Sequence, residues 1–277
     1  MKIALTGADG MLGHSLQKIF SDTSLIPFTQ ADFDITDLDS TVTTIKSARP
    51  DFLIHTAAYT NVDACESEPE KAYLVNGIGA RNVAIACEEI RCPIMHISSD
   101  YVFDGTQGAP YNEWDRTNPV SQYGLSKLMA EQFISSCTNR FYIIRTSWLY
   151  GSNGKNFVDT IVRLLAEQDQ LRVVNDQFGC PTFTEDLSCK LRELIGRGYG
   201  IYHITNSGIC SWYEFAVKIA EIKGIGKEIV PVTTREFTRP ANRPAYSALN
   251  NTMLRLEGIT PLRHWQEALG EYLSLRS

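Results

Sequence analysis

Short apolar runs alternate with longer amphipathic segments through the first 150 residues of the chain. The apolar runs predict strands over 2–6, 25–28, 52–56, 93–97 and 141–145. Apolar positions at helical spacing predict helices over 11–20, 38–48, 67–90 and 121–137. Because strands separated by helices pair through right-handed crossovers, they build a parallel sheet covered on both faces. We therefore expect an α/β fold with a doubly wound Rossmann-type parallel sheet.

The alternation loosens beyond residue 150. Helices are predicted over 155–168, 185–195, 211–223 and 264–275, with short strands near 171–174 and 201–204. The loop 238–244 combines two prolines with two arginines, which discourages regular structure. We predict a larger domain over 1–150, joined by returning segments from about 170–187 and 201–206, and a smaller C-terminal lobe over 151–277.

Composition places the 277-residue chain among ordinary globular proteins. It is 43% hydrophobic and 21% charged, with a net charge of −6 and no block of like charges, so neither a nucleic acid nor a membrane is an expected partner. The seven cysteines lack the spacing of a zinc site. No apolar stretch approaches the roughly 20 residues that span a bilayer, and the chain begins directly with a strand. We expect a cytoplasmic protein.

A glycine-rich turn follows the first predicted strand and opens the first helix. Its glycines have the spacing G-x-x-G-x-x-G. Glycine permits a tight turn and a close approach of the backbone to a pyrophosphate, which the positive end of the helix attracts. The turn therefore predicts a dinucleotide-binding domain. The cofactor-binding residues expected there are Gly7, Asp9, Gly10, Met11, Leu12 and Gly13.

The residues after the second strand leave the choice of cofactor open. An acidic residue for the ribose of NAD is expected about 20 residues beyond the turn. Neither a clear acid nor an arginine for the phosphate of NADP stands there. Asn76 interrupts an apolar helix, where it either hydrogen-bonds local structure or faces solvent. The further cofactor-binding candidates are Asp34, Ile35, Ala57, Ala58, Tyr59 and Asn76.

Tyr123 and Lys127 stand four residues apart on a predicted helix and so point the same way. An ammonium near a phenol stabilises the phenolate and lowers the pKa of the tyrosine from its usual value of about 10. Such a tyrosine exchanges a proton at a carbonyl or alcohol, and Ser99, at the end of an apolar run, can hydrogen-bond the same oxygen. These three residues are the predicted catalytic groups, and they favour carbonyl reduction.

The order of these motifs resembles the extended short-chain dehydrogenase/reductase superfamily. Within it, the segments 98–105 (Ser-Ser-Asp-Tyr-Val-Phe-Asp-Gly), 145–151 (Arg-Thr-Ser-Trp-Leu-Tyr-Gly) and 174–182 (Val-Asn-Asp-Gln-Phe-Gly-Cys-Pro-Thr) are similar to those of the dTDP-4-dehydrorhamnose reductases. The resemblance covers essentially the whole chain. Trp148 and the 174–182 segment are more specific to these reductases than the glycine turn and the Tyr-Lys pair, which epimerases and dehydratases share.

The resemblance implies that NADPH or NADH delivers hydride to C4 of dTDP-4-dehydro-L-rhamnose, giving dTDP-L-rhamnose for cell-surface polysaccharide. Tyr123 would protonate the developing alkoxide, while Lys127 would lower the pKa of Tyr123 and bind the nicotinamide ribose. The C-terminal lobe would mainly bind the dTDP-sugar. The implied substrate-binding residues are Ser99, Asp100, Tyr101, Val102, Phe103, Trp148, Asn156 and Arg243.

A metal-bridged dimer occurs in some members of this family. They hold the metal with a glutamate of the first helix and a Glu-Asp pair further along. Glu185-Asp186 is present here, but the first-helix position is Ser15. We therefore expect no required metal and either a monomer or a homodimer.

Two other classes of protein stay open. Another nucleotide-sugar reductase or an epimerase of the superfamily would use the same catalytic groups, whereas the dehydratases need an Asp-Glu pair that does not follow Ser99. A non-catalytic NADP-binding regulatory subunit of the methionine adenosyltransferase type also resembles these reductases. It carries asparagine at the position of Asp100 and lacks the 174–182 segment.

Overall fold

The predicted parallel sheet is present in the computed structural model of the chain, which describes residues 1–276. Six strands lie in the order β10-β5-β4-β3-β1-β2, and every neighbouring pair is parallel. The strands are β1 (Lys2–Thr6), β2 (Ser24–Phe28), β3 (Phe52–His55), β4 (Ile94–Ser99), β5 (Phe141–Thr146) and β10 (Gly200–His203).

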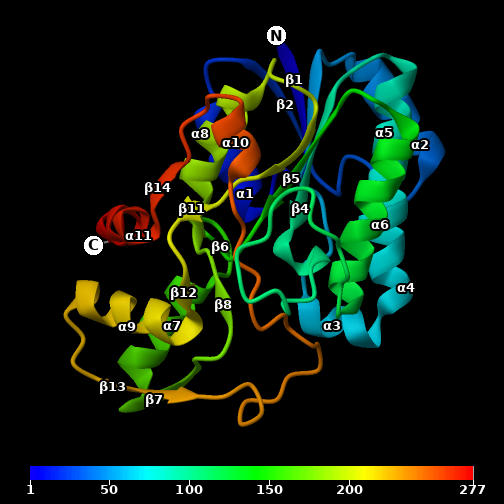
Figure 1. Cartoon of the computed structure of the whole chain (residues 1–277). Helices are drawn as coiled ribbons and strands as arrows, with labels where there is room; N and C mark the ends of the chain where they lie inside the picture. The colour runs from blue at the N-terminus through cyan, green and yellow to red at the C-terminus, as the bar shows by residue number, and fades with distance from the viewer. Residues whose placement is uncertain (277) are drawn as a thin grey trace.

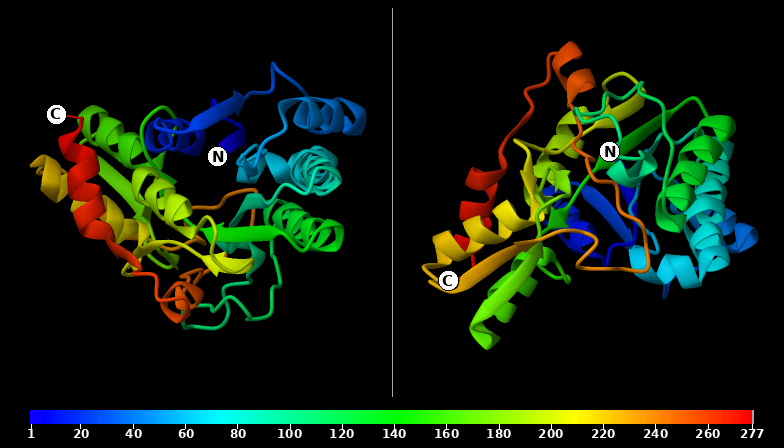
Figure 2. Two further views of the ribbon diagram at one scale, coloured as in Figure 1. Left: turned by 90° about the horizontal axis from the view of Figure 1, so that it is seen from above. Right: turned by 60° about the horizontal axis from the view of Figure 1, so that its bottom comes forward.

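Helices cover both faces of this sheet (Figures 1 and 2). Side chains alternate along each strand, so that Ile3 and Leu5 of β1 pack on one face and Ala4 packs on the other. Burial on both sides explains why the strands appear as unbroken apolar runs, and the doubly wound fold is confirmed. One face carries α1 (Met11–Ile19), α8 (Thr184–Leu194) and α10 (Thr252–Leu256), and the other carries α2 (Leu38–Ala48), α5 (Gly79–Glu89) and α6 (Gln122–Cys137).

The segment predicted as one helix over 67–90 is divided in the structure. It comprises the end of α3 (Val62–Ser67), α4 (Pro69–Ala72), the π-helical turn η1 (Tyr73–Ile78) and α5. Pro69 has no backbone N–H with which to continue α3, so a new helix starts there. The wide turn η1 contains Asn76, whose side chain is buried and binds the backbone of Tyr59. The hydrogen-bonding alternative for Asn76 is therefore confirmed.

The second half of the chain builds an apolar core of its own, called the C-terminal lobe, and also adds β10 to the main sheet and α8 to one of its faces. In the lobe, β7 (Gln170–Val174) pairs with β13 (Glu228–Val232) beside α7 (Phe157–Glu167), α9 (Trp212–Lys223) and α11 (Trp265–Ser274). Of the segment 170–187 that was expected to join the larger domain, β7 pairs with β13 in the lobe, whereas the start of α8 packs on the main sheet. The short elements are η2 (Asp100–Val102), β6 (Leu149–Tyr150), β8 (Phe178–Gly179), β9 (Thr182–Phe183), β11 (Asn206–Ser207), β12 (Cys210–Ser211) and β14 (Leu262–His264).

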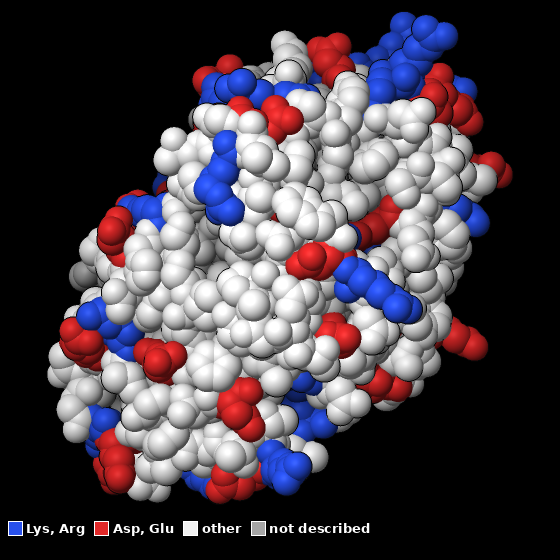
Figure 3. Space-filling view, in the orientation of Figure 1, with Lys and Arg blue, Asp and Glu red and all other residues white. Residues whose placement is uncertain are grey.

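The surface carries charges of both signs in small groups, as the face in Figure 3 shows. Within residues 1–276, no helix has the length and apolar character needed to cross a membrane.

A band of polar side chains crosses the α6 face of the sheet near the carboxyl ends of its strands. His55 and His96 lie side by side in register on β3 and β4. Arg145 on β5 forms a buried ion pair with Glu131 on α6, with 2.7 Å between Nη2 and Oε2. The Ser98 hydroxyl of β4 donates to the same carboxylate at 2.5 Å. These contacts fix the position of α6 on β4 and β5.

Replacing Arg145 by Met should lower the free energy of unfolding by about 3–5 kcal/mol, because the Glu131 carboxylate then stays buried without its counterion. Urea denaturation followed by circular dichroism measures the change. The control is Arg163→Ala, which breaks an exposed pair with Glu167 and should cost less than about 0.5 kcal/mol. Equal losses in the two variants would contradict the role given to the buried pair.

Candidate active site

The glycine turn and the predicted catalytic residues lie at the carboxyl edge of the main sheet, where ligands bind in doubly wound folds. The glycine turn follows β1, and Ser99 ends β4. Tyr123 and Lys127 lie in the first two turns of α6, which Ser121 caps by accepting from the Gly124 N–H at 3.1 Å. Because Gly124 has no Cβ, the segment after β4 packs directly against the start of α6.

The glycine turn has the shape that a pyrophosphate needs. Gly7 has a φ of 70°, and a Cβ on it would lie 2.6 Å from the Ala57 nitrogen, so only glycine fits between β1 and β3. A Cβ on Gly13 would collide with the carbonyl oxygen of Gly7. The helix α1 begins at Met11 and directs its positive end at the turn. The turn therefore fits a dinucleotide phosphate.

The other cofactor candidates differ in whether their side chains are exposed to a ligand or buried. The side chains of Leu12 and Ile35 are buried in the apolar core and leave only their backbone for a cofactor. Asp9 and Asp34 are exposed. The Asp34 carboxylate accepts from the N–H and the hydroxyl of Thr36, at 2.9 and 2.8 Å.

Asn76 joins the segment after β3 to α6. Its Oδ1 accepts from the Tyr59 N–H at 2.7 Å, and its Nδ2 donates to the Tyr59 carbonyl at 3.0 Å and to the Ser126 hydroxyl at 2.9 Å. Ser126 precedes Lys127, so Asn76 fixes the spacing between the edge of β3 and the predicted catalytic helix. Its direct contact with a cofactor stays a prediction.

Ser99 and Asp100 form a buried group with a serine from the C-terminal segment. The Ser99 hydroxyl donates to Asp100 Oδ1 at 2.9 Å, and the Ser247 hydroxyl donates to Asp100 Oδ2 at 2.6 Å. Burial raises the pKa of Asp100 to about 6, although both hydroxyls oppose the shift. The Tyr101 N–H donates to Ser99 Oγ at 3.1 Å. The Ser99 hydroxyl therefore points at Asp100 in this structure.

Tyr123 does not have the lowered pKa that the spacing to Lys127 predicts. Burial and then the Asp100 carboxylate raise the pKa of the phenol, and a hydrogen bond with Ser99 opposes them. The Tyr101 ring packs edge-to-face on Tyr123, with 5.5 Å between the centroids. The phenol therefore carries its proton at neutral pH, which is the form that a general acid needs.

Lys127 is buried, and its ammonium is bound by groups of β4. The Nζ donates to the Ile97 carbonyl at 2.7 Å and lies 3.4 Å from His96 Nε2. Burial lowers the pKa of Lys127 to about 8, and the charge of Glu131 on the next turn of α6 opposes that shift. These contacts explain why the ammonium does not dominate the pKa of Tyr123 in this structure.

The side chains of three residues implied as substrate-binding have structural roles, in apolar packing or in capping a helix. Val102 and Phe103 lie in a buried apolar cluster with Leu249. Asn156 is the N-cap of α7, where its Oδ1 accepts from the Asp159 N–H at 3.0 Å. The structure does not bring these three side chains to the other site residues.

Trp148 is held in a left-handed backbone conformation, with a φ of 49°, which is rare for a bulky residue. Its indole stacks on Trp212 of α9, with 3.4 Å between the centroids and 5° between the planes. A Cβ on Gly179 would lie 2.5 Å from the same indole. The glycine of the 174–182 segment therefore makes room for the Trp148 indole against Trp212.

Arg243 lies at a groove of about 750 Å³ in the C-terminal lobe. Its Nη2 donates to Asp63 Oδ1 of α3 at 3.0 Å, and Arg239 lies 3.8 Å from the same carboxylate. Both arginines line the groove together with Trp212 and Phe157. Guanidinium groups beside aromatic walls suit a base that is joined to a pyrophosphate.

Four residues that shape this site were missed by the sequence analysis: Ser247, Asp63, Trp212 and His96. Ser247 binds Asp100 across 147 positions. No local pattern marks such a pairing. His96 alone has a readable signal, because a polar side chain inside an apolar strand needs a partner.

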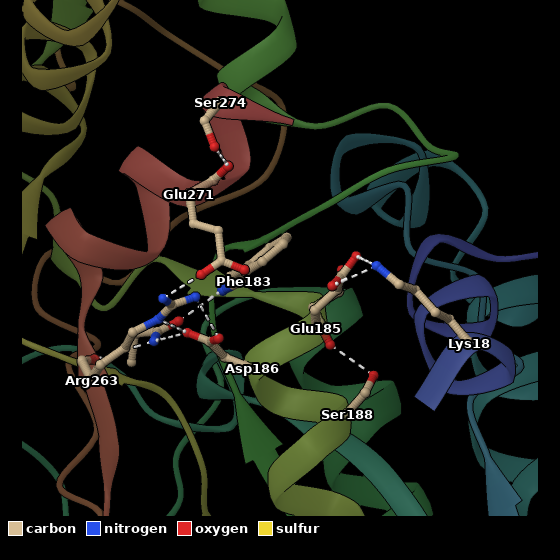
Figure 4. A network of polar contacts seen from close by, with 10 residues as sticks. Lys18, Phe183, Glu185, Asp186, Ser188, Arg263, Glu271 and Ser274 are labelled. Carbon is tan, nitrogen blue, oxygen red and sulfur yellow. Dashed lines mark hydrogen bonds and ion pairs between the residues drawn. The ribbon is translucent and has the colours of Figure 1, made fainter. Parts of the chain in front are cut away.

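The carboxylates considered for a metal are bound to cations of the same chain (Figure 4). Glu185 accepts from Lys18 Nζ at 2.8 and 2.9 Å, and Asp186 accepts from the Arg263 guanidinium at 2.8 and 2.9 Å. Ser15 adds no charge to the group. Within residues 1–276, no three or more His, Cys, Asp or Glu side chains are arranged to hold a metal ion. In this structure, Glu185 and Asp186 are therefore already paired with cationic side chains of their own chain.

Replacing Asp100 by Asn should alter how stability depends on pH. The folded protein raises the pKa of Asp100 from 3.8 to about 6, so its contribution is present below about pH 4 and is lost as pH rises through 6. Wild type should lose about 3 kcal/mol of unfolding free energy across this window from Asp100, and Asp100→Asn should not. Urea denaturation at several pH values compares the two, and identical pH slopes would contradict the assignment.

Comparisons with known proteins agree with this site. A family model described as RmlD substrate binding domain matches residues 1–276. The spore coat polysaccharide biosynthesis protein SpsK of Bacillus subtilis is 45% identical over 100% of this chain and 98% of its own length.

Two crystal structures of dTDP-4-dehydrorhamnose reductases have the same fold. The structure from Clostridium acetobutylicum has a TM-score of 0.98 at 44% identity, over 100% of this chain and 99% of the other. The structure from Bacillus anthracis, in complex with NADP, has a TM-score of 0.97 at 41% identity, over 99% of this chain and 100% of the other. The chain therefore belongs to the RmlD substrate binding domain family, which confirms the resemblance to the dTDP-4-dehydrorhamnose reductases.

Proposed function

We propose that this chain is an NAD(P)H-dependent oxidoreductase that reduces the C4 keto group of dTDP-4-dehydro-L-rhamnose to give dTDP-L-rhamnose. The observation that carries the proposal is the grouping of the Tyr123 phenol with the Ser99 hydroxyl at the end of β4, with the glycine turn at the same edge of the sheet. Relatives that bear this reductase name match the chain over its whole length. The name of SpsK supports a product used in polysaccharide synthesis.

The glycine turn and Lys127 would bind the cofactor. NADPH or NADH supplies the hydride when it is bound. The backbone of Gly7 and the start of α1 would hold the pyrophosphate, since a Cβ at Gly7 would fill the space beside Ala57. Lys127 would donate to the nicotinamide ribose. A relative solved in complex with NADP supports a nicotinamide cofactor.

Tyr123 would supply the proton for the reduction. As hydride reaches C4, the carbonyl oxygen gains negative charge and takes the phenolic proton of Tyr123. The Ser99 hydroxyl, which points at Asp100 in this structure, would turn to donate to the same oxygen. The Lys127 ammonium would stabilise the phenolate that remains until solvent returns a proton.

The groove of the C-terminal lobe would bind the nucleotide part of the substrate. Arg243 and Arg239 would exchange the Asp63 carboxylate for the pyrophosphate, which presents more oxygens to a planar guanidinium. Trp148 stacks on Trp212 of this groove, and we propose that the sugar sits between Trp148 and Ser99. We also propose that residues 1–150 bind the cofactor and 151–277 mainly the sugar nucleotide, in a cytoplasmic monomer or homodimer.

Turnover by the purified protein tests the proposal against its alternatives. Incubation with dTDP-4-dehydro-L-rhamnose and each reduced cofactor should oxidise one cofactor for every sugar converted. An epimerase would change the sugar without net oxidation of the cofactor. A regulatory subunit would bind NADP and leave the sugar unchanged.

Replacing Tyr123 by Phe should lower kcat by roughly 10²–10⁴-fold, because the ring stays and the proton donor is lost. Steady-state oxidation of the reduced cofactor measures this effect. Tyr199→Phe is the matched control, since Tyr199 is exposed before β10, and it should keep the wild-type rate. Near-normal turnover by Tyr123→Phe would refute the assignment of the acid.

A chelator should leave the rate unchanged, because Lys18 and Arg263 already neutralise the carboxylates of Glu185 and Asp186. The measurement compares turnover before and after dialysis against EDTA. A large loss that magnesium restores would contradict the expectation that no metal is required.

A further inference from the structure

The Lys127 ammonium has three N–H groups, and protein acceptors lie near two of them. The Ile97 carbonyl lies 2.7 Å from Nζ, and His96 Nε2 lies 3.4 Å from it. We propose that His96 is a positioning residue that accepts one of these N–H groups and so directs the third toward the cofactor ribose and Tyr123. The inference rests on the proposed function, in which Lys127 serves those two groups.

The fold holds His96 under α6 with little freedom to move. His96 lies inside β4, three residues before Ser99. Alternation along the strand puts its side chain on the α6 face, while Met95 and Ile97 face the α1 side. The residue is 1% exposed, and a buried polar side chain needs a partner. Lys127 is the partner that α6 presents.

The contact with Lys127 sets the protonation state of His96. A ring nitrogen that accepts from an ammonium carries no hydrogen, so the proton of the neutral ring is on Nδ1. Burial and then the Lys127 charge lower the pKa of His96, which keeps the ring neutral. Nδ1 is buried and has no hydrogen-bond partner within residues 1–276. An unpaired buried N–H destabilises a fold. The presence of a histidine at position 96 in spite of this cost therefore favours a role for His96 at the site.

The other charged and titratable groups of α6 do not replace this contact. Glu131 lies one turn after Lys127, but its carboxylate is occupied by Arg145 at 2.7 Å and by Ser98 at 2.5 Å. Tyr123 lies one turn before Lys127, and its phenol is protonated at neutral pH. Within the described contacts, the ammonium is therefore oriented from β4.

His55 provides a matched control on the neighbouring strand. It is 1% exposed, like His96, and its ring stacks on His96 with 5.1 Å between the centroids. Its Nδ1 is bonded to the Thr6 hydroxyl at 2.7 Å. Replacing His55 therefore perturbs the same part of the core without removing an acceptor from Lys127.

Equilibrium binding of NADPH across about pH 6 to pH 10, followed by its fluorescence, tests the inference. Wild type should lose affinity as Lys127 deprotonates, with a midpoint at about pH 8. His96→Leu should lower this midpoint by about half to one pH unit and weaken binding near the wild-type midpoint by roughly three- to tenfold, because the ammonium loses an acceptor. His96→Gln, which restores an acceptor, should recover most of the affinity. His55→Leu should keep the wild-type midpoint.

An unchanged midpoint in His96→Leu, or an equal shift in His55→Leu, overturns the inference. If His96→Leu does not fold, His96→Asn takes its place, because the shorter amide remains polar but does not reach Nζ; the same shift is expected. The binding measurement needs no sugar. A wild type that binds NADPH as expected but does not reduce the dTDP-sugar would therefore refute the proposed function alone.

Discussion

The polar contacts between α6 and the strands beneath it position the whole candidate site. Arg145 forms an ion pair with Glu131 of α6, and the Ser98 hydroxyl donates to the same carboxylate. One turn earlier on α6, Lys127 donates to the Ile97 carbonyl. These polar contacts are directional and fully buried, so they add a specific match between helix and strands to the apolar packing of α6. With them, the helix that carries the proposed acid has one register relative to Ser99.

This arrangement places charged and polar groups where water does not reach them. Burial lowers the pKa of Lys127 to about 8 and raises the pKa of Asp100 to about 6. Both groups would be more stable in water as ions, so the fold gives up stability to keep them at the site. Burial also raises the pKa of Tyr123 above its ordinary value of about 10, so the phenol is in its protonated form at neutral pH. In the proposed reduction, that proton is the one delivered to the sugar oxygen.

Most strands and helices and the glycine turn could be predicted from the sequence, because they depend on residues that are close together in the chain. Strands buried on both faces appear as apolar runs, and the glycine turn is marked by residues that only a close backbone approach requires, such as Gly7. The predicted strands β1 to β5 and most helices are therefore confirmed. The divided 67–90 segment was not foreseen, since the tertiary contacts of Asn76 favour a π-helical turn that helix propensity does not predict.

The rest of the site depends on contacts between distant parts of the chain. Ser247 meets Asp100, and Asp63 meets Arg243, only once the C-terminal segment lies across the sheet edge. The expected effect of Lys127 on Tyr123 was wrong for the same reason, since the ammonium is bound from β4 instead. Spacing along one helix gave the direction of the two side chains but not the partners that β4 supplies.

The central claim is that hydride goes to C4 of the sugar while the protein supplies the proton. The most direct measurement uses reduced cofactor deuterated at its reactive carbon together with dTDP-4-dehydro-L-rhamnose, and locates the label in the product by NMR. We expect dTDP-L-rhamnose with deuterium at C4 and an equal amount of oxidised cofactor. Deuterium at another carbon, or a changed sugar without label, would contradict it.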